Sequence, residues 1–182
     1  MKKIFTLILT MTVLSFGFVS CVSNDTEKKP ETVQTRQKKS DAELEYERAT
    51  KDLKGEVVSM DTFEKDKKEI LAKISELNVI MKSKDYKSWT GYIEPSSINY
   101  WSQKKNLSSA SKQLPVKGIQ LKTLEDYFNY VFIPSRVGRN IDEIRYISST
   151  SIKAVQVRDD DVIIFYNFKK IKGEWFVELP VL

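Results

Sequence analysis

The spacing of the hydrophobic residues changes near residue 144, and this change restricts the possible folds more than any other feature of the chain. Between residues 61 and 81, apolar side chains recur with a period near 3.6, as they do on one face of an α-helix. From Ile144 onwards the period is two, which is typical of β-strands. Helices followed by a run of antiparallel strands predict the α+β class, with amino-terminal helices packed on one face of a sheet.

Four strands are expected in the carboxy-terminal part, with turns at residues 159–161 and at Lys172-Gly173, where glycine can take a positive φ. The stretch "VIIFYNF" is apolar on both faces and is therefore predicted to be the central strand. Alternate residues of the last strand are predicted to share one buried face, namely Trp175, Val177, Leu179 and Val181. The expected strands are Ile144–Ser148, Ile152–Arg158, Val162–Ile171 and Glu174–Val181.

The helices are predicted from their end signals. Ser40 and Glu43 form a capping box for a helix that ends near Gly55, but its apolar stripe is thin, so it either lies on the domain or stands free. Asp61 and Glu64 form a capping pair for the longest helix. A short helix is predicted from Asp85 to a break at Pro95, with a further turn in "INYWSQ". The last predicted helix starts at Thr123, is capped by Asp126 and stops at Pro134.

Cys21 is the only cysteine of the chain, and it directly follows an apolar stretch. Lys2 and Lys3 precede sixteen uncharged residues, 4–19, and small residues appear just before the cysteine. This is the composition of a secretory signal, and the stretch is shorter than the ~20 apolar residues of a membrane-spanning helix. The sequence therefore predicts a signal peptide over residues 1–20.

The residues "FVSC" (18–21) resemble the lipobox of bacterial lipoproteins, in the looser form of spirochaetes because Phe18 stands where leucine is usual. The resemblance implies that Cys21 carries a thioether-linked diacylglycerol, and that a peptidase cuts before it and the new amino terminus is acylated. Two or more acyl chains anchor a protein stably in a bilayer, whereas one does not. The expected location is the bacterial cell envelope, with the choice between inner and outer membrane left open.

Composition excludes several kinds of chemistry. The chain has no histidine, which is the commonest general base and metal ligand, and lipidation would use its one thiol. No metal or cofactor is therefore predicted. Without Lys2 and Lys3 the mature chain keeps 28 of the 30 basic residues against 25 acidic ones, a net charge of +3. This charge does not imply a nucleic-acid partner, and none is expected.

The chain is expected to divide into three parts. After the signal peptide, residues 21–58 hold the lipidated cysteine, a flexible tether and the short helix, and residues 59–182 form the folded domain. Within the tether, Val22–Lys39 has only two strongly apolar residues and cannot offset its ordering entropy by burial. Fully extended at ~3.3–3.6 Å per residue, these eighteen residues reach at most about 60 Å, enough to hold a domain clear of a lipid surface.

The segments "EILAKISELNVIMKSKDYKSW" (69–89) and "DDDVIIFYNFKKIKGEWFVELP" (159–180) resemble the first two helices and the closing hairpin of the NTF2-like (cystatin-like) superfamily. The resemblance covers residues 60–182 and lies in pattern and order. It implies a cone formed by a curved sheet that wraps a long amino-terminal helix, with a pocket between them. The segment "LEDYFNYVFIPSR" (124–136) is also similar to one in uncharacterised spirochaete lipoproteins.

Two functions are compatible with these features. The first is an envelope lipoprotein whose domain binds an envelope protein or a small apolar ligand without catalysis. The second is a small NTF2-like enzyme that uses a pocket carboxylate and a tyrosine for acid/base chemistry. Asp85, Glu94 and Asp126 are its candidate carboxylates, although capping accounts for two of them.

The candidate binding residues are aromatic or basic, and each group has a simpler interpretation. Aromatic side chains either line a ligand pocket or fill the core. Five lysines in the acid-free residues 95–124 either meet anionic lipid headgroups or a cell-wall polymer, or belong to a solvated loop. The pocket candidates are Trp89, Tyr92, Tyr100, Trp101, Tyr127 and Tyr130, and the candidate anion contacts are Arg136 and Arg139.

We predict that radiolabelled fatty acid enters the wild-type protein but not the Cys21→Ser variant, because the thioether bond requires the thiol. The mature chain is expected to begin at Cys21 when its intact mass is measured. Equal labelling of both proteins, or a mass that retains Met1, would contradict the prediction.

Overall fold

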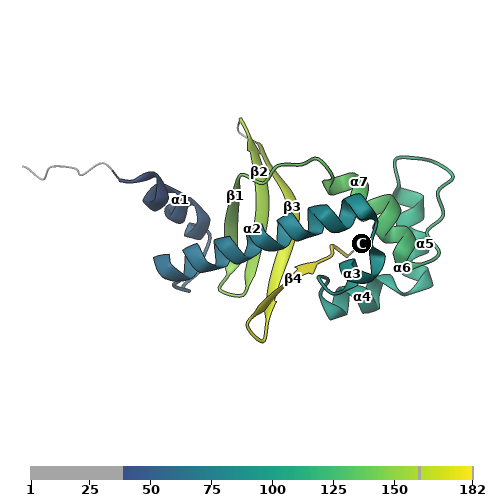
Figure 1. Ribbon diagram of the computed structural model, residues 1–182, viewed down its shortest axis with the longest axis horizontal. Coiled ribbons are helices and arrows are strands. Elements are labelled where there is room, and N and C mark those ends of the chain that lie inside the picture. The colour runs from purple at the N-terminus through teal and green to yellow at the C-terminus, as the bar shows by residue number, and fades with distance from the viewer. Residues whose placement is uncertain (1–38, 160, 182) are drawn as a thin grey trace, which may run out of the picture. The chain divides into compact units, whose positions relative to one another are not determined.

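The computed structural model describes residues 39–159 and 161–181 (Figure 1). The predicted signal peptide, Cys21 and residues 22–38 of the predicted tether lie outside the described residues. Among the described residues, no helix combines the length and the apolar composition that crossing a bilayer requires.

Helices come first and strands last along the described chain, which confirms the α+β class. The helices are α1 (Asp41–Thr50), α2 (Met60–Ser83), α3 (Tyr86–Thr90), α4 (Pro95–Trp101), α5 (Lys104–Gln113), α6 (Leu124–Tyr127), the π-helical η1 (Phe128–Phe132) and α7 (Ile133–Arg136). The strands are β1 (Glu143–Ser148), β2 (Ser151–Arg158), β3 (Asp161–Ile171) and β4 (Glu174–Glu178).

The strands form an open antiparallel sheet in the order β1-β2-β3-β4. The predicted turn between β3 and β4 is confirmed, since Lys172 and Gly173 both have positive φ (50° and 90°), as a type I′ hairpin requires. One strand end was predicted wrongly. Because β4 ends at Glu178, Val181 lies beyond it and is 66% exposed instead of sharing the buried face.

The two faces of the sheet differ in burial. Successive side chains of a strand point to opposite faces, and α2 crosses the face that we call the inner face (Figure 1). The inner face carries buried side chains from all four strands: Ile144, Tyr146, Ile152, Ala154, Tyr166, Phe168, Trp175 and Val177. The opposite, outer face carries Arg145, Ile147, Lys153, Val155, Val157, Val162 and Ile164.

A β-bulge divides β3 into two unlike halves. Ala154 pairs with Tyr166, but the next residue, Val155, pairs with Ile164, so Phe165 has no partner on β2. β3 lies between β2 and β4, as expected of a central strand. Its first half is apolar on both faces but is not fully buried, since Val162, Ile163 and Ile164 are 42%, 38% and 46% exposed.

The long helix α2 supplies the main layer against the sheet. It buries one stripe of apolar side chains, as its period predicted: Phe63, Ile70, Ile74, Leu77, Ile80 and Met81. Its cap differs from the prediction. The N-cap is Ser59, whose side chain accepts a hydrogen bond from the Thr62 N–H at 3.2 Å, so Asp61 and Glu64 lie within the helix.

Helix α1 lies on the domain, which resolves the two alternatives left open by its sequence. The predicted Ser40–Glu43 capping box is present. The Tyr46 ring lies 5.7 Å from the Phe63 ring of α2, and its hydroxyl donates to the Val58 carbonyl at 2.5 Å. Helix α1 therefore belongs to the same compact unit as the sheet.

The middle of the chain contains more helix than predicted. Pro95 begins α4 instead of only breaking the chain, and part of the lysine-rich segment forms α5. The predicted Thr123–Asp126 cap starts α6, but Pro134 does not stop the helical path. Proline is tolerated there because it lies in the first turn of α7, where its missing N–H is not needed.

Trp175→Ala is expected to lower the free energy of unfolding by about 3–5 kcal/mol, the range for deleting a large buried aromatic side chain. Denaturant titration measures the change. The control Val181→Ala, at an exposed position six residues further on, should stay within about 0.5 kcal/mol. A loss below about 1 kcal/mol for Trp175→Ala would contradict its place in the core.

Candidate functional site

Asp66 is a fully buried carboxylate that projects from α2 onto the inner face of the sheet. Its Oδ1 atom accepts hydrogen bonds from Lys170 Nζ at 2.7 Å and from Trp175 Nε1 at 3.2 Å. Its Oδ2 atom accepts one from the Tyr146 hydroxyl at 2.9 Å. Burial and this hydrogen bond raise the pKa of Tyr146, so the phenol stays protonated and donates.

Glu94 joins α4 to the end of the sheet. It is buried, and it caps α4 by accepting a hydrogen bond from the Ser97 N–H at 3.1 Å. It also accepts a hydrogen bond from Lys169 Nζ at 3.3 Å. Ser97 in turn accepts a hydrogen bond from the Leu179 N–H at 3.0 Å. Burial raises the pKa of Glu94, but hydrogen bonds from Ser96, Ser97 and Lys169 outweigh burial, and the net effect is a lowered pKa.

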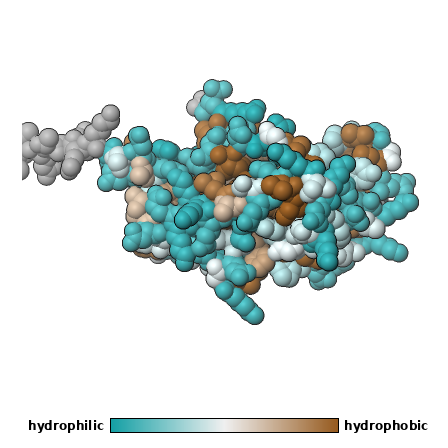
Figure 2. Space-filling model, in the orientation of Figure 1, coloured by the Kyte–Doolittle hydropathy of each residue, from teal (hydrophilic) through white to brown (hydrophobic). Residues whose placement is uncertain are grey.

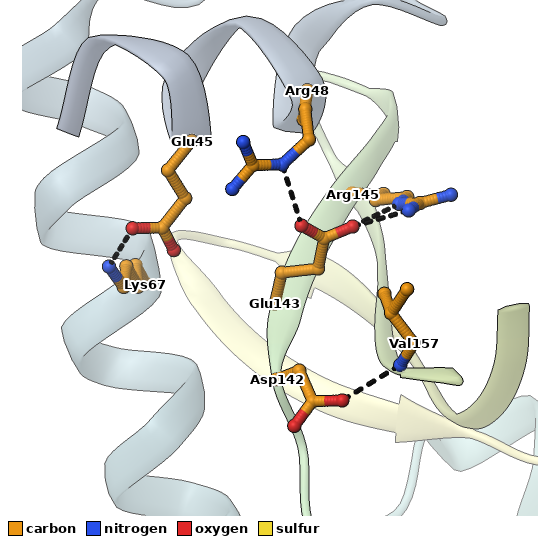
Figure 3. Close-up of polar contacts among 7 residues, drawn as sticks. All are labelled: Glu45, Arg48, Lys67, Asp142, Glu143, Arg145 and Val157. Carbon is orange, nitrogen blue, oxygen red and sulfur yellow. Dashed lines mark hydrogen bonds and ion pairs between the residues drawn. The ribbon is translucent and has the colours of Figure 1, made fainter. Parts of the chain in front are cut away.

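Glu143 fastens α1 to the edge strand β1 (Figure 3). The carboxylate lies between Arg48 of α1, whose Nε is 3.1 Å away, and Arg145 of the same strand. A second ion pair joins Glu45 of α1 to Lys67 of α2 at 2.6 Å. Burial raises the pKa of Glu143, and its bonds to Arg145 and Arg48 lower it by more.

The carboxylates suggested by the sequence serve as caps in the structure. Asp85 accepts from the Ser88 N–H at 3.0 Å, and Asp126 accepts from the Lys122 and Thr123 N–H groups at 2.9 Å. Sequence reasoning missed Asp66. The signal was present, because Asp66 lies three residues after Phe63 and four before Ile70, on the apolar stripe of α2.

The six aromatic pocket candidates do not converge on one site. Trp101 and Tyr127 stack with ring centroids 4.3 Å apart, and Tyr100 meets the Trp101 ring edge-on at 5.1 Å. Trp89 is fully buried against Phe128 and Phe132. Tyr92 donates to Glu76 at 2.7 Å, and Tyr130 is half exposed.

The two stacked rings line a small apolar cleft of about 210 Å³, below the ~300–1,000 Å³ of drug-sized ligand pockets. Trp101 is held in place by its Nε1 atom, which donates to the Pro180 carbonyl at 3.2 Å. We call this site the aromatic cleft; its walls are Trp101, Ala110, Gln113, Leu114, Tyr127, Val131 and Pro180. Its size suits one small apolar group.

The two candidate arginines face aromatic rings. The Arg136 guanidinium is buried, with its central carbon 4.1 Å from the Phe132 ring centroid and 5.2 Å from that of Tyr166. Its Nε atom has no hydrogen-bond partner among the described residues, and burial lowers the pKa of Arg136. Burial also raises the pKa of Tyr166, to about 12. Arg139 lies over the Phe165 ring at 6.0 Å.

A groove of about 730 Å³ lies on the outer face of the sheet, between the strands and the segment that follows α1. We call it the outer groove. The segment contributes Lys51, Asp52, Leu53, Lys54 and Glu56, and the strands contribute Arg145, Tyr146, Ile147, Lys153, Val155, Val162 and Ile164. Sequence reasoning missed this groove because the apolar residues of "VIIFYNF" predict a strand but do not show which of its faces another element covers.

Comparison with known proteins gives one informative similarity. No family model matches the chain, and no solved structure matches it. The chain is 30% identical over 118 residues to a protein of Treponema pallidum (strain Nichols) named "Uncharacterized lipoprotein". The match covers 65% of this chain and 63% of that relative, so the chain spans less than two thirds of its length. The similarity supports the prediction that the chain is a lipoprotein.

Asp66→Ala is expected to lower the free energy of unfolding by about 3–5 kcal/mol, because removing one partner of a buried ion pair leaves the other uncompensated. Denaturant titration again measures the change. Glu64→Ala removes an exposed carboxylate from the same helix and should change it by less than about 0.5 kcal/mol. Equal effects of the two substitutions would show that the Asp66 hydrogen bonds contribute little.

Proposed function

We propose that the chain is a membrane-anchored lipoprotein of the bacterial cell envelope whose folded domain binds an envelope protein or a small apolar ligand without catalysis. The anchor is the acylated Cys21, inserted in the lipid bilayer. The lipobox-like residues 18–21 and the lipoprotein relative support it. The order of elements, with α2 across the inner face of an antiparallel sheet, supports an NTF2-like fold.

The aromatic cleft is the observation that carries the binding function. Aromatic rings offer a large rigid apolar surface, and the cleft brings Trp101 and Tyr127 together with aliphatic walls. Exposed apolar residues lie within two positions of its lining residues in sequence: Val116, Tyr130 and Val181. Figure 2 shows a small group of hydrophobic residues at the upper right, at the loop that joins α5 to α6. A small alkyl group, or one aliphatic side chain of a partner, fits this site.

One observation favours the enzymatic alternative. Asp66 and the Tyr146 hydroxyl, 2.9 Å apart, are a buried carboxylate–tyrosine pair of the kind that acid/base chemistry would use. Asp66 is fully buried, however, and Lys170 and Trp175 occupy its other oxygen. A substrate would have to displace these donors to reach it. The binding function requires no such opening.

The experiment for the cleft uses the mature chain from residue 21 with Cys21→Ser, titrated with 6-bromohexan-1-ol as a small neutral quencher. Tryptophan fluorescence is expected to fall along a saturating curve, and Trp101→Phe should remove the saturating part. Val131→Phe narrows the cleft and should raise the dissociation constant about tenfold with the unfolding temperature nearly unchanged.

The matched control is Val79→Phe, the same substitution at an exposed position of α2 outside the cleft, which should leave the titration unchanged. If quenching never saturates and is equal in all variants, Trp101 and Tyr127 are core residues only, and the cleft binds nothing of this kind.

A further inference from the structure

The floor of the outer groove is a contiguous apolar strip across neighbouring strands. Val155 pairs with Ile164, and Val157 pairs with Val162, so these side chains lie beside one another on the outer face. Among the lining residues, Val155 is buried at the bottom, whereas Val162, Ile164 and Ile147 of β1 are exposed. The exposed Val157 extends the strip just outside the groove. Adjacent exposed aliphatic side chains of this kind mark a binding surface more often than isolated ones do.

The rim of the outer groove is positively charged. Lys51, Lys54 and Lys153 line it, and none of them makes an ion pair with any of the described residues. Of the two acids on the rim, Glu56 accepts a hydrogen bond from the Ser149 N–H at 2.5 Å. Three unpaired ammonium groups therefore surround the apolar floor, with Asp52 as the one unengaged carboxylate among the described lining residues.

We infer that the outer groove binds a long-chain carboxylate, that is, a fatty acid. The alkyl chain lies along Val155, Val162 and Ile164, and the carboxylate meets the lysines of the rim. The volume of about 730 Å³ lies within the ~300–1,000 Å³ range of ligand pockets. The inference goes beyond the proposed function, because the site shares no residue with the aromatic cleft and selects a charged ligand.

Charge and shape favour this ligand over other occupants. If a second copy met the groove face to face about a two-fold axis, the same patch would contact itself and bring the rim lysines toward one another. The groove is also concave, with the segment 51–56 as one wall, and this shape suits an inserted chain better than a flat bilayer surface. A fatty acid satisfies both the apolar floor and the cationic rim.

The wall formed by residues 51–56 is held in place by α1. Arg48 is bound to Glu143 at 3.1 Å, and Lys67 of α2 binds Glu45 at 2.6 Å (Figure 3). The groove is therefore present before a ligand arrives, and binding does not have to order this wall. A preformed site of this kind loses less affinity to ordering than a flexible one.

The test is calorimetric titration of the mature chain from residue 21 with Cys21→Ser, using decanoate, dodecanoate and tetradecanoate below their micelle-forming concentrations. A fully buried methylene contributes a factor of about four in affinity. Each two-carbon step should therefore tighten binding several-fold, up to about fifteenfold. Dodecyltrimethylammonium, with the same chain length as dodecanoate but a cationic head, should bind at least about tenfold more weakly.

Two kinds of variant locate the site. Ile164→Glu places a charge on the floor and should weaken tetradecanoate binding at least about tenfold, whereas Val79→Glu, at an exposed position of α2 outside the groove, should not. The double variant Lys54→Glu and Lys153→Glu leaves the floor untouched and should reduce the preference for carboxylate over ammonium. Val131→Phe in the aromatic cleft should leave fatty-acid binding unchanged, which separates this proposal from the previous one.

Three outcomes would overturn the inference. The first is equal affinity for the anionic and cationic amphipaths, or no binding of either. The second is a concentration-dependent dimer that Ile164→Glu dissociates while no carboxylate binds, which would assign the face to a second copy. The third is binding to phosphatidylglycerol vesicles without binding of monomeric fatty acids, which would assign it to a membrane surface.

Discussion

The hydrogen bonds of Asp66 fix how α2 lies against the sheet. Its donors come from three strands, namely Tyr146 of β1, Lys170 of β3 and Trp175 of β4. A buried carboxylate is strongly unfavourable unless it is paired. Rotating α2 by one residue would turn Asp66 by about 100° and lose all three donors. We infer that the acid specifies the position of the helix, while the apolar stripe around it supplies most of the stability.

Carboxylates fasten the outlying helices in the same way, and this arrangement bears on function. Glu94, which caps α4, ties that helix to β3 through Lys169, and Glu143 ties α1 to β1. These acids and Asp66 each accept several hydrogen bonds, so their carboxylate oxygens are already used in contacts that hold the fold together. The two hollows described above have largely apolar floors instead. Acid/base catalysis by any of these three acids would require its release from these hydrogen bonds, whereas binding at the two hollows would not.

The parts of the fold that depend on local signals could be predicted from the sequence. The period of α2, the capping box of α1 and the Lys172-Gly173 turn are each set by neighbouring residues. Helix α5 was missed because its buried apolar residues are only Leu107 and Ala110, among lysines and serines. The stretch "VIIF" predicts a strand. Distant segments of the chain, however, determine which face of that strand is covered. The exposure of Val162–Ile164 and the outer groove therefore could not be predicted from the sequence. The burial of Trp89 and the packing of Trp101 on Tyr127 likewise depend on tertiary contacts, which the number of aromatic residues in the sequence does not predict.

The outer groove and the predicted anchor are close along the chain, and this proximity affects how tight the binding has to be. Helix α1 begins at Asp41, twenty residues after Cys21, and the wall of the groove follows it at residues 51–56. Twenty extended residues at ~3.3–3.6 Å each reach at most about 70 Å, so a tethered domain stays near the lipid surface. A ligand that leaves or enters that surface then meets the groove at a high effective concentration. An open groove of modest affinity is sufficient under these conditions, and it releases its ligand faster than an enclosed cavity of the same chemistry would.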